Sequence, residues 1–167
     1  MSSLPERMPE SYGDALARLA RAERLDVDDM KLMVLLETAG EPLYAKLAEL
    51  VEPAEAKELL LANGREETAH AHRLKRAIEK KTGRAYTLPT LAENPYAKPP
   101  PFAAVDAALL AGVQQGEIAG DAMYQRYADH EPDPEIADWL RQNGREELRH
   151  RDRVAQVIGI LSGGDVG

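Results

Sequence analysis

The 167-residue sequence contains no cysteine, and this absence removes several classes of site. A chain without thiols has no disulfide framework, no thiolate zinc or iron–sulfur site and no cysteine nucleophile. Aromatic residues make up only 5% of the chain, while alanine, leucine, glutamate and arginine are abundant. Because that balance favours helix over sheet, we expect an all-α fold.

Basic runs and long apolar runs are also missing. The chain has 21 basic and 29 acidic residues and a formal net charge of −8, and no basic patch of the kind that binds nucleic acid stands out. No apolar run approaches the ~18 residues of a membrane span. The first 14 residues are polar and lack the apolar core of a signal peptide. We expect a soluble and most simply cytoplasmic protein, with neither nucleic acid nor membrane as a partner.

An internal repeat organises the chain. Shifting the sequence by 80 residues aligns residues 31–80 with residues 111–160 without a gap, and 15 of the 50 positions are identical. Roughly three identities would arise by chance at average composition. The longest identical run, Asn63–Glu67, recurs as Asn143–Glu147. The pattern indicates a duplicated helical hairpin.

Each repeat predicts two long helices. In the first repeat, Asp26–Asp29 supply N-cap chemistry, leucines follow at helical spacing, Pro53 suits the first turn of the next helix and Gly83 ends it. A short leading helix is predicted at roughly residues 14–25. The predicted divisions are an N-terminal extension at 1–26, a bundle at 27–162 and a C-terminal tail at 163–167.

A long connection separates the two hairpins. Residues 83–102 hold five of the eleven prolines. A helix of about 29 residues is roughly 44 Å long, whereas twenty residues of extended, proline-rich chain span roughly 60 Å. The connection therefore crosses the whole length of a four-helix bundle. The predicted order is hairpin 27–82, crossover 83–102 and hairpin 103–162.

Glutamates and histidines fall at matched heights in this bundle. Glu37 lies 15 residues before the turn at Glu52, and Glu67 lies 15 residues after it. His70 follows Glu67 by three residues and shares its helix face. If the hairpins pack with two-fold symmetry, four carboxylates and two imidazoles converge at mid-bundle, a set that suits iron or manganese. The predicted metal ligands are Glu37, Glu67, His70, Glu117, Glu147 and His150.

With these residues the chain resembles the ferritin-like superfamily of diiron-carboxylate proteins, in the bacterioferritin and rubrerythrin branch but without a rubredoxin domain. The resemblance covers about residues 29–160. It implies a ferritin-like four-helix bundle with two iron ions, although manganese or zinc remains an alternative. By that likeness Glu37 and Glu117 are terminal ligands, Glu67 and Glu147 bridge the two metals, and the two histidines are terminal nitrogen ligands.

The chain departs from both branches of that family. Rubrerythrins carry an additional carboxylate three residues after the first ligand of the second hairpin, where this chain has Gly120. Bacterioferritins place a haem-ligating methionine beside a bridging glutamate, whereas the neighbours here are Glu66 and Thr68. The tail is too short and too rich in glycine for the extra helix of cage-forming ferritins, so we do not expect a 24-subunit shell.

Two tyrosines and two further carboxylates accompany the predicted ligands. Tyr44 and Tyr124 each follow a ligand glutamate by seven residues. They are candidate catalytic residues, as hydrogen-bond donors to a ligand or as oxidisable side chains, or else core aromatics. Glu41 and Asp121 either accept the second ring proton of a ligating histidine or are ordinary solvated carboxylates.

Small residues and one proline mark the helices near the predicted ligands. Gly40 and Gly120 are expected to leave open space beside the metals. Gly64 and Gly144 are expected to permit close helix approach. Pro42 removes a helical hydrogen bond and predicts a kink or bulge that the second hairpin lacks.

The function we expect is that of a diiron oxidoreductase, a ferroxidase or rubrerythrin-like peroxidase. It would oxidise Fe(II) with dioxygen or hydrogen peroxide and draw on an unknown electron-donor protein. Two other classes stay open: a diiron oxygenase or hydroxylase acting on an organic substrate, and a metal-binding protein without turnover. A metal-free bundle is the third alternative, but it would have to bury six ionisable groups at a large desolvation cost. We expect a homodimer, because related bundles often pair.

Overall fold

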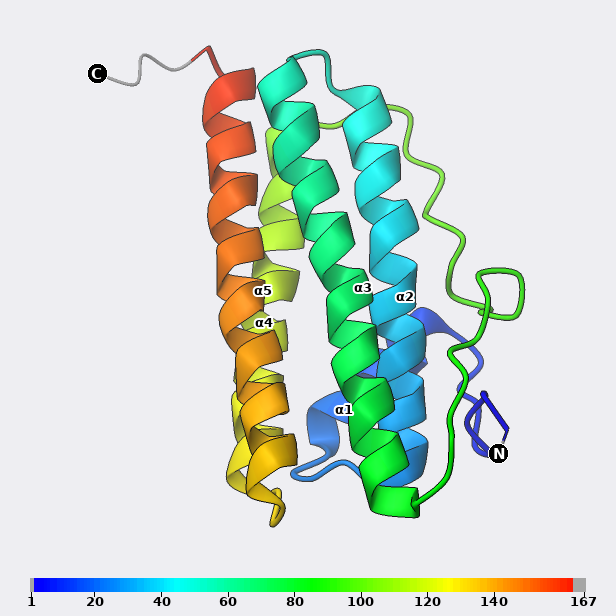
Figure 1. The fold of residues 1–167 in the computed structure, drawn as a ribbon. Helices are drawn as coiled ribbons and strands as arrows, with labels where there is room; N and C mark the ends of the chain where they lie inside the picture. Colours follow the sequence, from blue (N-terminus) through cyan, green and yellow to red (C-terminus); the bar gives the residue numbers. More distant parts are fainter. Residues whose placement is uncertain (1, 164–167) are drawn as a thin grey trace.

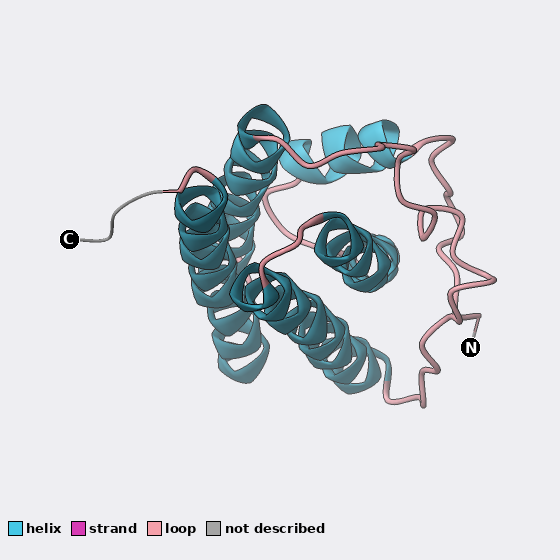
Figure 2. Ribbon diagram, turned by 90° about the horizontal axis from the view of Figure 1, so that it is seen from above, coloured by secondary structure: helices cyan, strands magenta, loops and turns pink. Residues whose placement is uncertain are grey.

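Four long helices run alongside one another, and a shorter helix lies across the outside of the bundle (Figures 1 and 2). The computed structural model describes residues 2–163. The fold class predicted from the sequence, an all-α bundle of two hairpins with a leading helix, is confirmed. Most of the predicted tail, residues 164–167, lies outside the described residues. The helices are α1 (Tyr12–Arg21), α2 (Val27–Leu50), α3 (Ala54–Thr82), α4 (Ala107–Asp129) and α5 (Pro134–Leu161).

Local chemistry accounts for where the helices begin and end. Asp26 caps α2 by accepting a hydrogen bond from the backbone nitrogen of Asp29, whose side chain caps in return. Asp106 and Asp133 cap α4 and α5 in the same way with one side chain each. Gly83 ends α3 in the left-handed region, at φ 65°, which favours glycine. The leading helix, expected at roughly residues 14–25, begins two residues earlier and ends four residues earlier than expected.

The crossover covers α2. It runs from the end of α3 to the start of α4 along the outside of the bundle (Figure 1). The side-chain nitrogen of Asn94 donates a 2.7 Å hydrogen bond to the backbone oxygen of Leu35. The hydroxyls of Tyr86 and Tyr96 donate to the backbone oxygens of Ser3 and Pro9 at 2.6 and 2.7 Å. These bonds tie the crossover to α2 and to the N-terminal segment.

Helix α1 bridges α2 and α4. Arg18 of α1 forms a 2.6 Å ion pair with Asp29 of α2. On the other side, the hydroxyl of Tyr127 in α4 donates a 2.7 Å hydrogen bond to the backbone oxygen of Leu19. Ala15 and Leu19 are fully buried. The leading helix therefore packs on the bundle itself, across the space between its first and third long helices.

The hydrophobic core is split into two clusters with a polar layer between them. One cluster includes Leu32, Leu35 and Tyr127, and the other includes Leu47 and Leu60. Helix α2 contributes to both and is α-helical without interruption through Pro42, so the local bulge expected there is not seen. Among the described residues, no helix combines the length and apolar character needed to cross a membrane. The polar layer between the two clusters holds the candidate site.

Candidate metal centre

The six residues predicted as ligands come together in this polar layer. Each is at most 8% exposed. They form two overlapping groups, and within each group one ligand atom per residue lies within 4.8 Å of all the others. The groups are Glu37, Glu67, His70 and Glu147, and Glu67, Glu117, Glu147 and His150.

Two glutamates belong to both groups. Glu67 of α3 and Glu147 of α5 are shared, whereas each of the other four residues belongs to one group only. A carboxylate has two oxygens and can bind two ions at once, so shared glutamates between two groups suit a dinuclear centre. The structure thus places two buried Glu/His clusters side by side, as a pair of metal ions requires.

Each histidine is oriented by a carboxylate from the opposite hairpin. The Nε2 atom of His70 lies 3.1 Å from Glu146, and the Nε2 atom of His150 lies 3.1 Å from Glu66. The ring is therefore held by Nε2 while Nδ1 faces the clustered glutamates, as with His70 Nδ1 at 3.2 Å from Glu37. Metal-binding histidines usually give their second ring nitrogen to such an acceptor.

The carboxylates that orient the histidines are not those considered in the sequence. Glu41 accepts a 3.0 Å hydrogen bond from the hydroxyl of Thr68, and Asp121 accepts a 2.9 Å bond from the side chain of Gln125. Neither contacts a histidine. Of the two alternatives given for these positions, support of a histidine is ruled out, because both face the partner helix of their own hairpin whereas the histidines are supported from across the bundle.

An arginine and an asparagine complete this support. Arginine partners for Glu66 and Glu146 are expected from the sequence, but it singles out neither these arginines nor the asparagines. Arg73 donates hydrogen bonds of 2.7 and 2.9 Å to the two carboxylate oxygens of Glu146 and a 2.7 Å bond to the side-chain oxygen of Asn143. Asn143 in turn donates to the backbone oxygen of His70 at 3.4 Å. The other hairpin repeats the arrangement, because Arg153 bonds Glu66 and Asn63, and Asn63 bonds the backbone of His150. Both arginines and both asparagines are identical across the 80-residue shift, and this was the available signal.

Burial and charge act against each other on the orienting glutamates. Burial by itself raises the pKa of Glu66, but the hydrogen bond and charge of Arg153 outweigh it and lower the pKa below its ordinary value. For Glu146, burial also raises the pKa, but bonds from His70 and Arg73 lower it strongly. Both carboxylates therefore stay ionised and accept the Nε2 hydrogen of the facing histidine.

The metal-free cluster binds protons where metals would otherwise sit. Burial alone lowers the pKa of His150, but the carboxylates of Glu117, Glu147 and Glu67 raise it to about 12. Burial raises the pKa of Glu117 to about 8. The upward shift of the His150 pKa indicates that the glutamates at the centre favour positive charge beside them, whereas the shift of the Glu117 pKa reflects its burial.

The residues present fit two divalent metal ions. Four glutamates would balance the charge of two such ions, and carboxylate oxygen with imidazole nitrogen is a donor set that iron and manganese accept. The Nδ1 atom of His150 is buried and has no hydrogen-bond partner among the described residues. It nevertheless lies 3.3 Å from oxygens of Glu67 and Glu147. A buried nitrogen aimed at carboxylates without a hydrogen bond is well placed to bind a metal.

A comparison with known families agrees with this geometry. The family model described as Rubrerythrin matches residues 33–158. The chain belongs to the rubrerythrin family. No characterised protein and no solved structure was found to match the chain. The matched region of this rubrerythrin-family chain contains all six clustered residues, whereas α1 precedes it.

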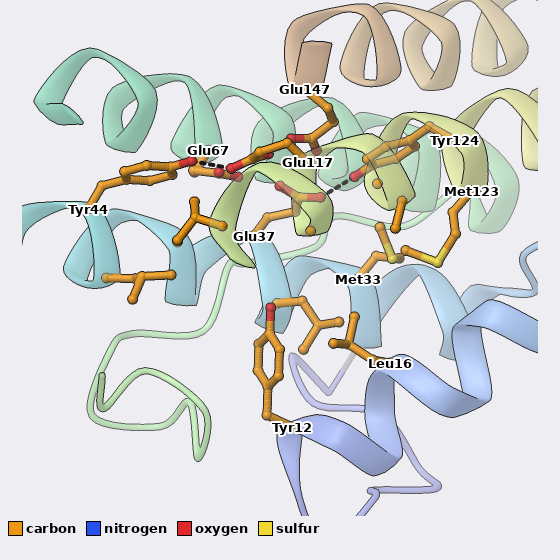
Figure 3. Close-up of a pocket in the computed structure, with 17 residues that line it drawn as sticks. Tyr12, Leu16, Met33, Glu37, Tyr44, Glu67, Glu117, Met123, Tyr124 and Glu147 are labelled. Carbon is orange, nitrogen blue, oxygen red and sulfur yellow. Dashed lines mark hydrogen bonds between the residues drawn. The ribbon is translucent and has the colours of Figure 1, made fainter. Parts of the chain in front are cut away.

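The two tyrosines singled out in the sequence bond to glutamates of the opposite hairpin. The Tyr44 hydroxyl donates to Glu117, and the Tyr124 hydroxyl donates to Glu37 (Figure 3). Both tyrosines are at most 1% exposed. Each hydroxyl fixes one oxygen of a predicted terminal ligand, and the other oxygen faces a histidine Nδ1, at 3.2 Å for Glu37 and 3.5 Å for Glu117. Their role in catalysis stays a prediction.

The glycines of this rubrerythrin-family site are not equivalent. A Cβ added at Gly40 would lie 2.6 Å from Cγ of Glu67, whereas one added at Gly120 would lie 3.4 Å from the nearest atoms of Glu147. Gly40 therefore permits close contact with a shared glutamate, while Gly120 has room for a methyl group. At Gly64 and Gly144, an added Cβ would lie 3.3 and 3.1 Å from the Cβ of Tyr44 and Tyr124, so these glycines do permit close helix approach.

A pocket opens onto the glutamate cluster between α2 and α4 (Figure 3). Its volume is about 230 Å³. All four clustered glutamates line it, and so do Gly40 and Gly120. The open space expected beside the site is present at Gly120 but not at Gly40, where the side chain of Glu67 lies against the glycine. The apolar part of the wall consists of Leu16, Met33, Leu36, Leu43, Val113, Ala119 and Met123. A small molecule can therefore reach the cluster from the side where α1 lies.

Proposed function

We propose that this rubrerythrin-family protein is a diiron oxidoreductase that uses dioxygen or hydrogen peroxide as its oxidant. The observation that supports this most strongly is the pair of buried Glu/His clusters that share Glu67 and Glu147 and open into a small pocket. A pair of ferrous ions, when bound, would supply the two electrons that, together with two protons from solvent, reduce one hydrogen peroxide to two waters.

The chain's own residues prepare the site for such chemistry. The imidazoles and terminal glutamates would each hold one ion, and the shared glutamates would hold the pair together. The cross-hairpin bonds from Glu66, Glu146 and the two tyrosines fix these side chains before any ion arrives. That arrangement reduces the reorganisation required when the charge of the centre changes.

Iron in place of manganese or zinc, and an external electron-donor protein, are also part of this proposal. The donor set accepts all three metals. Zinc has no redox chemistry, so the proposed reaction requires iron or manganese, and we take iron as the metal to test first. A protein that returns the pair to the ferrous state is required for repeated turnover. A homodimer and a cytoplasmic location remain proposals of the same kind.

An anaerobic Fe(II) titration tests the proposal directly. The wild-type chain is expected to bind two ions and to develop a ferric absorption band when the sample is mixed with peroxide or dioxygen. The double variant Glu67→Ala/Glu147→Ala should bind neither ion, while Glu55→Ala, an exposed residue of the first turn of α3, should behave as wild type. Two bound ions without oxidation by either oxidant would leave a metal-binding protein without turnover.

The pocket favours one second candidate, a diiron oxygenase or hydroxylase. Its walls are largely apolar, and it reaches the glutamates directly. At about 230 Å³ it is smaller than the ~300–1,000 Å³ of sites for drug-sized ligands, so the substrate would be a small apolar molecule. Consumption of reductant that depends on added substrate would support this candidate, and consumption driven by peroxide alone would count against it.

A further inference from the structure

The pocket beside the glutamate cluster contains three tyrosine hydroxyls, and two of them are already engaged. Tyr44 and Tyr124 direct their hydrogens to Glu117 and Glu37. The remaining polar side chains of the wall are the four glutamates, which in their ionised form only accept hydrogen bonds. Tyr12 is the third tyrosine. None of the described residues forms a hydrogen bond with its hydroxyl, so it is the one side chain of the wall with a free donor.

Tyr12 lies at the entrance of the pocket. It is the first residue of α1 and is 44% exposed as a whole. Its hydroxyl end points inward, toward Glu37 and the other glutamates (Figure 3). Burial of that hydroxyl and the charges of Glu67 and Glu37 raise its pKa above the ordinary value, so the hydroxyl keeps its proton at neutral pH.

The surrounding structure holds Tyr12 in this position. Its ring packs edge-to-face on Tyr96 of the crossover, with ring centres 6.2 Å apart and an interplanar angle of 86°. Ser11 caps the helix by accepting a hydrogen bond from the backbone of Asp14. One turn on, Leu16 lines the same pocket. The N-terminal segment thus supplies a fixed wall that the residues matched by the family model do not provide.

We propose that Tyr12 is the oxidant-binding residue of this protein: its hydroxyl donates the hydrogen bond that holds hydrogen peroxide in the pocket beside the four glutamates. The inference rests on the proposed function, because it assumes a metal pair that reacts with a small oxygen ligand. Peroxide oxygen accepts hydrogen bonds, and the ionised glutamates repel its lone pairs. A single donor at the entrance therefore orients the molecule and helps to retain it.

A redox-inert probe tests this inference apart from catalysis. The protein is loaded with Co(II), and azide, a small anion that accepts hydrogen bonds, is titrated in while the visible Co(II) absorption is followed. Tyr12→Phe should bind azide about 5- to 10-fold more weakly than wild type, which corresponds to the loss of one hydrogen bond. Tyr86→Phe is the matched control, because its hydroxyl bonds Ser3 away from the pocket, and its azide affinity should be unchanged.

The reaction supplies the second readout. With iron bound, Tyr12→Phe should keep the stoichiometry of anaerobic Fe(II) binding but should react with peroxide about 5- to 10-fold more slowly at low peroxide concentration. Dioxygen is a poor hydrogen-bond acceptor, so its reaction should slow by less than 2-fold.

Three outcomes would overturn the inference. The first is that Tyr12→Phe leaves both the azide affinity and the peroxide rate unchanged. The second is that only Tyr12→Ala changes them, which would mean that the residue shapes the pocket without donating a hydrogen bond. The third is that the wild-type Co(II) protein binds no azide. Failure of the proposed function is a separate result. It would appear as iron that binds but is not oxidised, while azide affinity still depends on the Tyr12 hydroxyl.

Discussion

The two hairpins resemble each other at the metal centre and differ outside it. In the α2–α3 hairpin, Leu32 and Leu35 are fully buried beneath the crossover and the N-terminal segment. The residues 80 positions later, Gly112 and Gln115 of α4, are exposed. Ile118, also on α4, remains 39% exposed. The duplication thus keeps those positions that support the site, while each outer surface follows its own environment.

The cross-hairpin bonds explain why the repeated positions stay alike. Each histidine depends on a glutamate, an arginine and an asparagine whose counterparts support the other histidine. A change in one hairpin therefore affects the ligand supplied by the other hairpin. Among the described residues, no reciprocal bonds of this kind link the outer faces of α2 and α4, and their residues differ.

The largest expected effect breaks the symmetry of the ligand set. Glu67→Ala or Glu147→Ala should remove both metal ions, because each residue belongs to both clusters. Glu37→Ala or Glu117→Ala should remove only one ion, because each belongs to a single cluster. Iron counted per chain in an anaerobic titration distinguishes the two classes. One ion retained in Glu67→Ala would show that this glutamate does not bridge.

The next effect compares the two carboxylates that orient the histidines. Glu66→Gln and Glu146→Gln should each weaken metal binding by about 10- to 100-fold, the usual range for such supporting residues. Glu146 should be nearer the upper limit, because its side chain is 7% exposed and that of Glu66 is 24% exposed. Metal affinity measured by competition with a chelator is the readout.

Glu41→Gln is the matched control for those two variants. Glu41 bonds only Thr68 and touches neither histidine, so its affinity should equal that of wild type. A loss of affinity as large as that of Glu66→Gln would contradict the assignment of the supporting carboxylates.

A third comparison uses the two glycines beside the shared glutamates. Gly40→Ala places a methyl group 2.6 Å from Cγ of Glu67. The overpacking should destabilise the fold by about 1–3 kcal/mol. The higher helix propensity of alanine offsets ~1 kcal/mol of that loss. Gly120→Ala has room and should stabilise the fold by up to ~1 kcal/mol. Urea denaturation of the metal-free proteins measures both. Equal effects would mean that the two halves are packed alike.

The last prediction concerns how the stability of the metal-free protein depends on pH. A raised folded pKa contributes stability below the unfolded value and loses it as the pH rises through the folded one. Nearby carboxylates raise the pKa of His150 to about 12, against the effect of burial. The free energy of unfolding therefore falls as the pH rises above about 6.5, the pKa of an unperturbed histidine. The pKa of Glu117, raised by burial to about 8, acts in the same direction between about 4.5 and 8.

Stability of the metal-free protein should consequently fall from about pH 6 to about pH 9, by at most ~1.4 kcal/mol per pH unit for each proton released. Urea denaturation in the presence of a chelator measures it. The metal-loaded protein should show the opposite trend, because metal binding requires the deprotonated ligands. If the stability of the metal-free protein instead rose with pH, the raised pKa values given to His150 and Glu117 would be wrong.

Much of the fold was predictable because its signals are local. Asp26 and Gly83 mark helix ends through backbone chemistry that involves only neighbouring residues. The ligand set was equally accessible, since Glu67 and His70 share a helix face and recur 80 residues later. The sequence left the roles of Glu41 and Asp121 open between two alternatives, because the partner of a side chain across a bundle depends on which helices face each other.

The sequence by itself determined the hairpin duplication, the four long helices and the six residues that meet at mid-bundle. These follow from periodicity, capping and equal distances from the turns, all of which depend only on spacing along the chain. The tertiary structure alone decided that Glu66 and Glu146 hold the histidines of the opposite hairpin. It also decided that α1 brings Tyr12 to the pocket and that Gly40 is crowded where Gly120 is not. Those outcomes depend on how helices that are distant in sequence pack together, and no local sequence pattern predicts that packing.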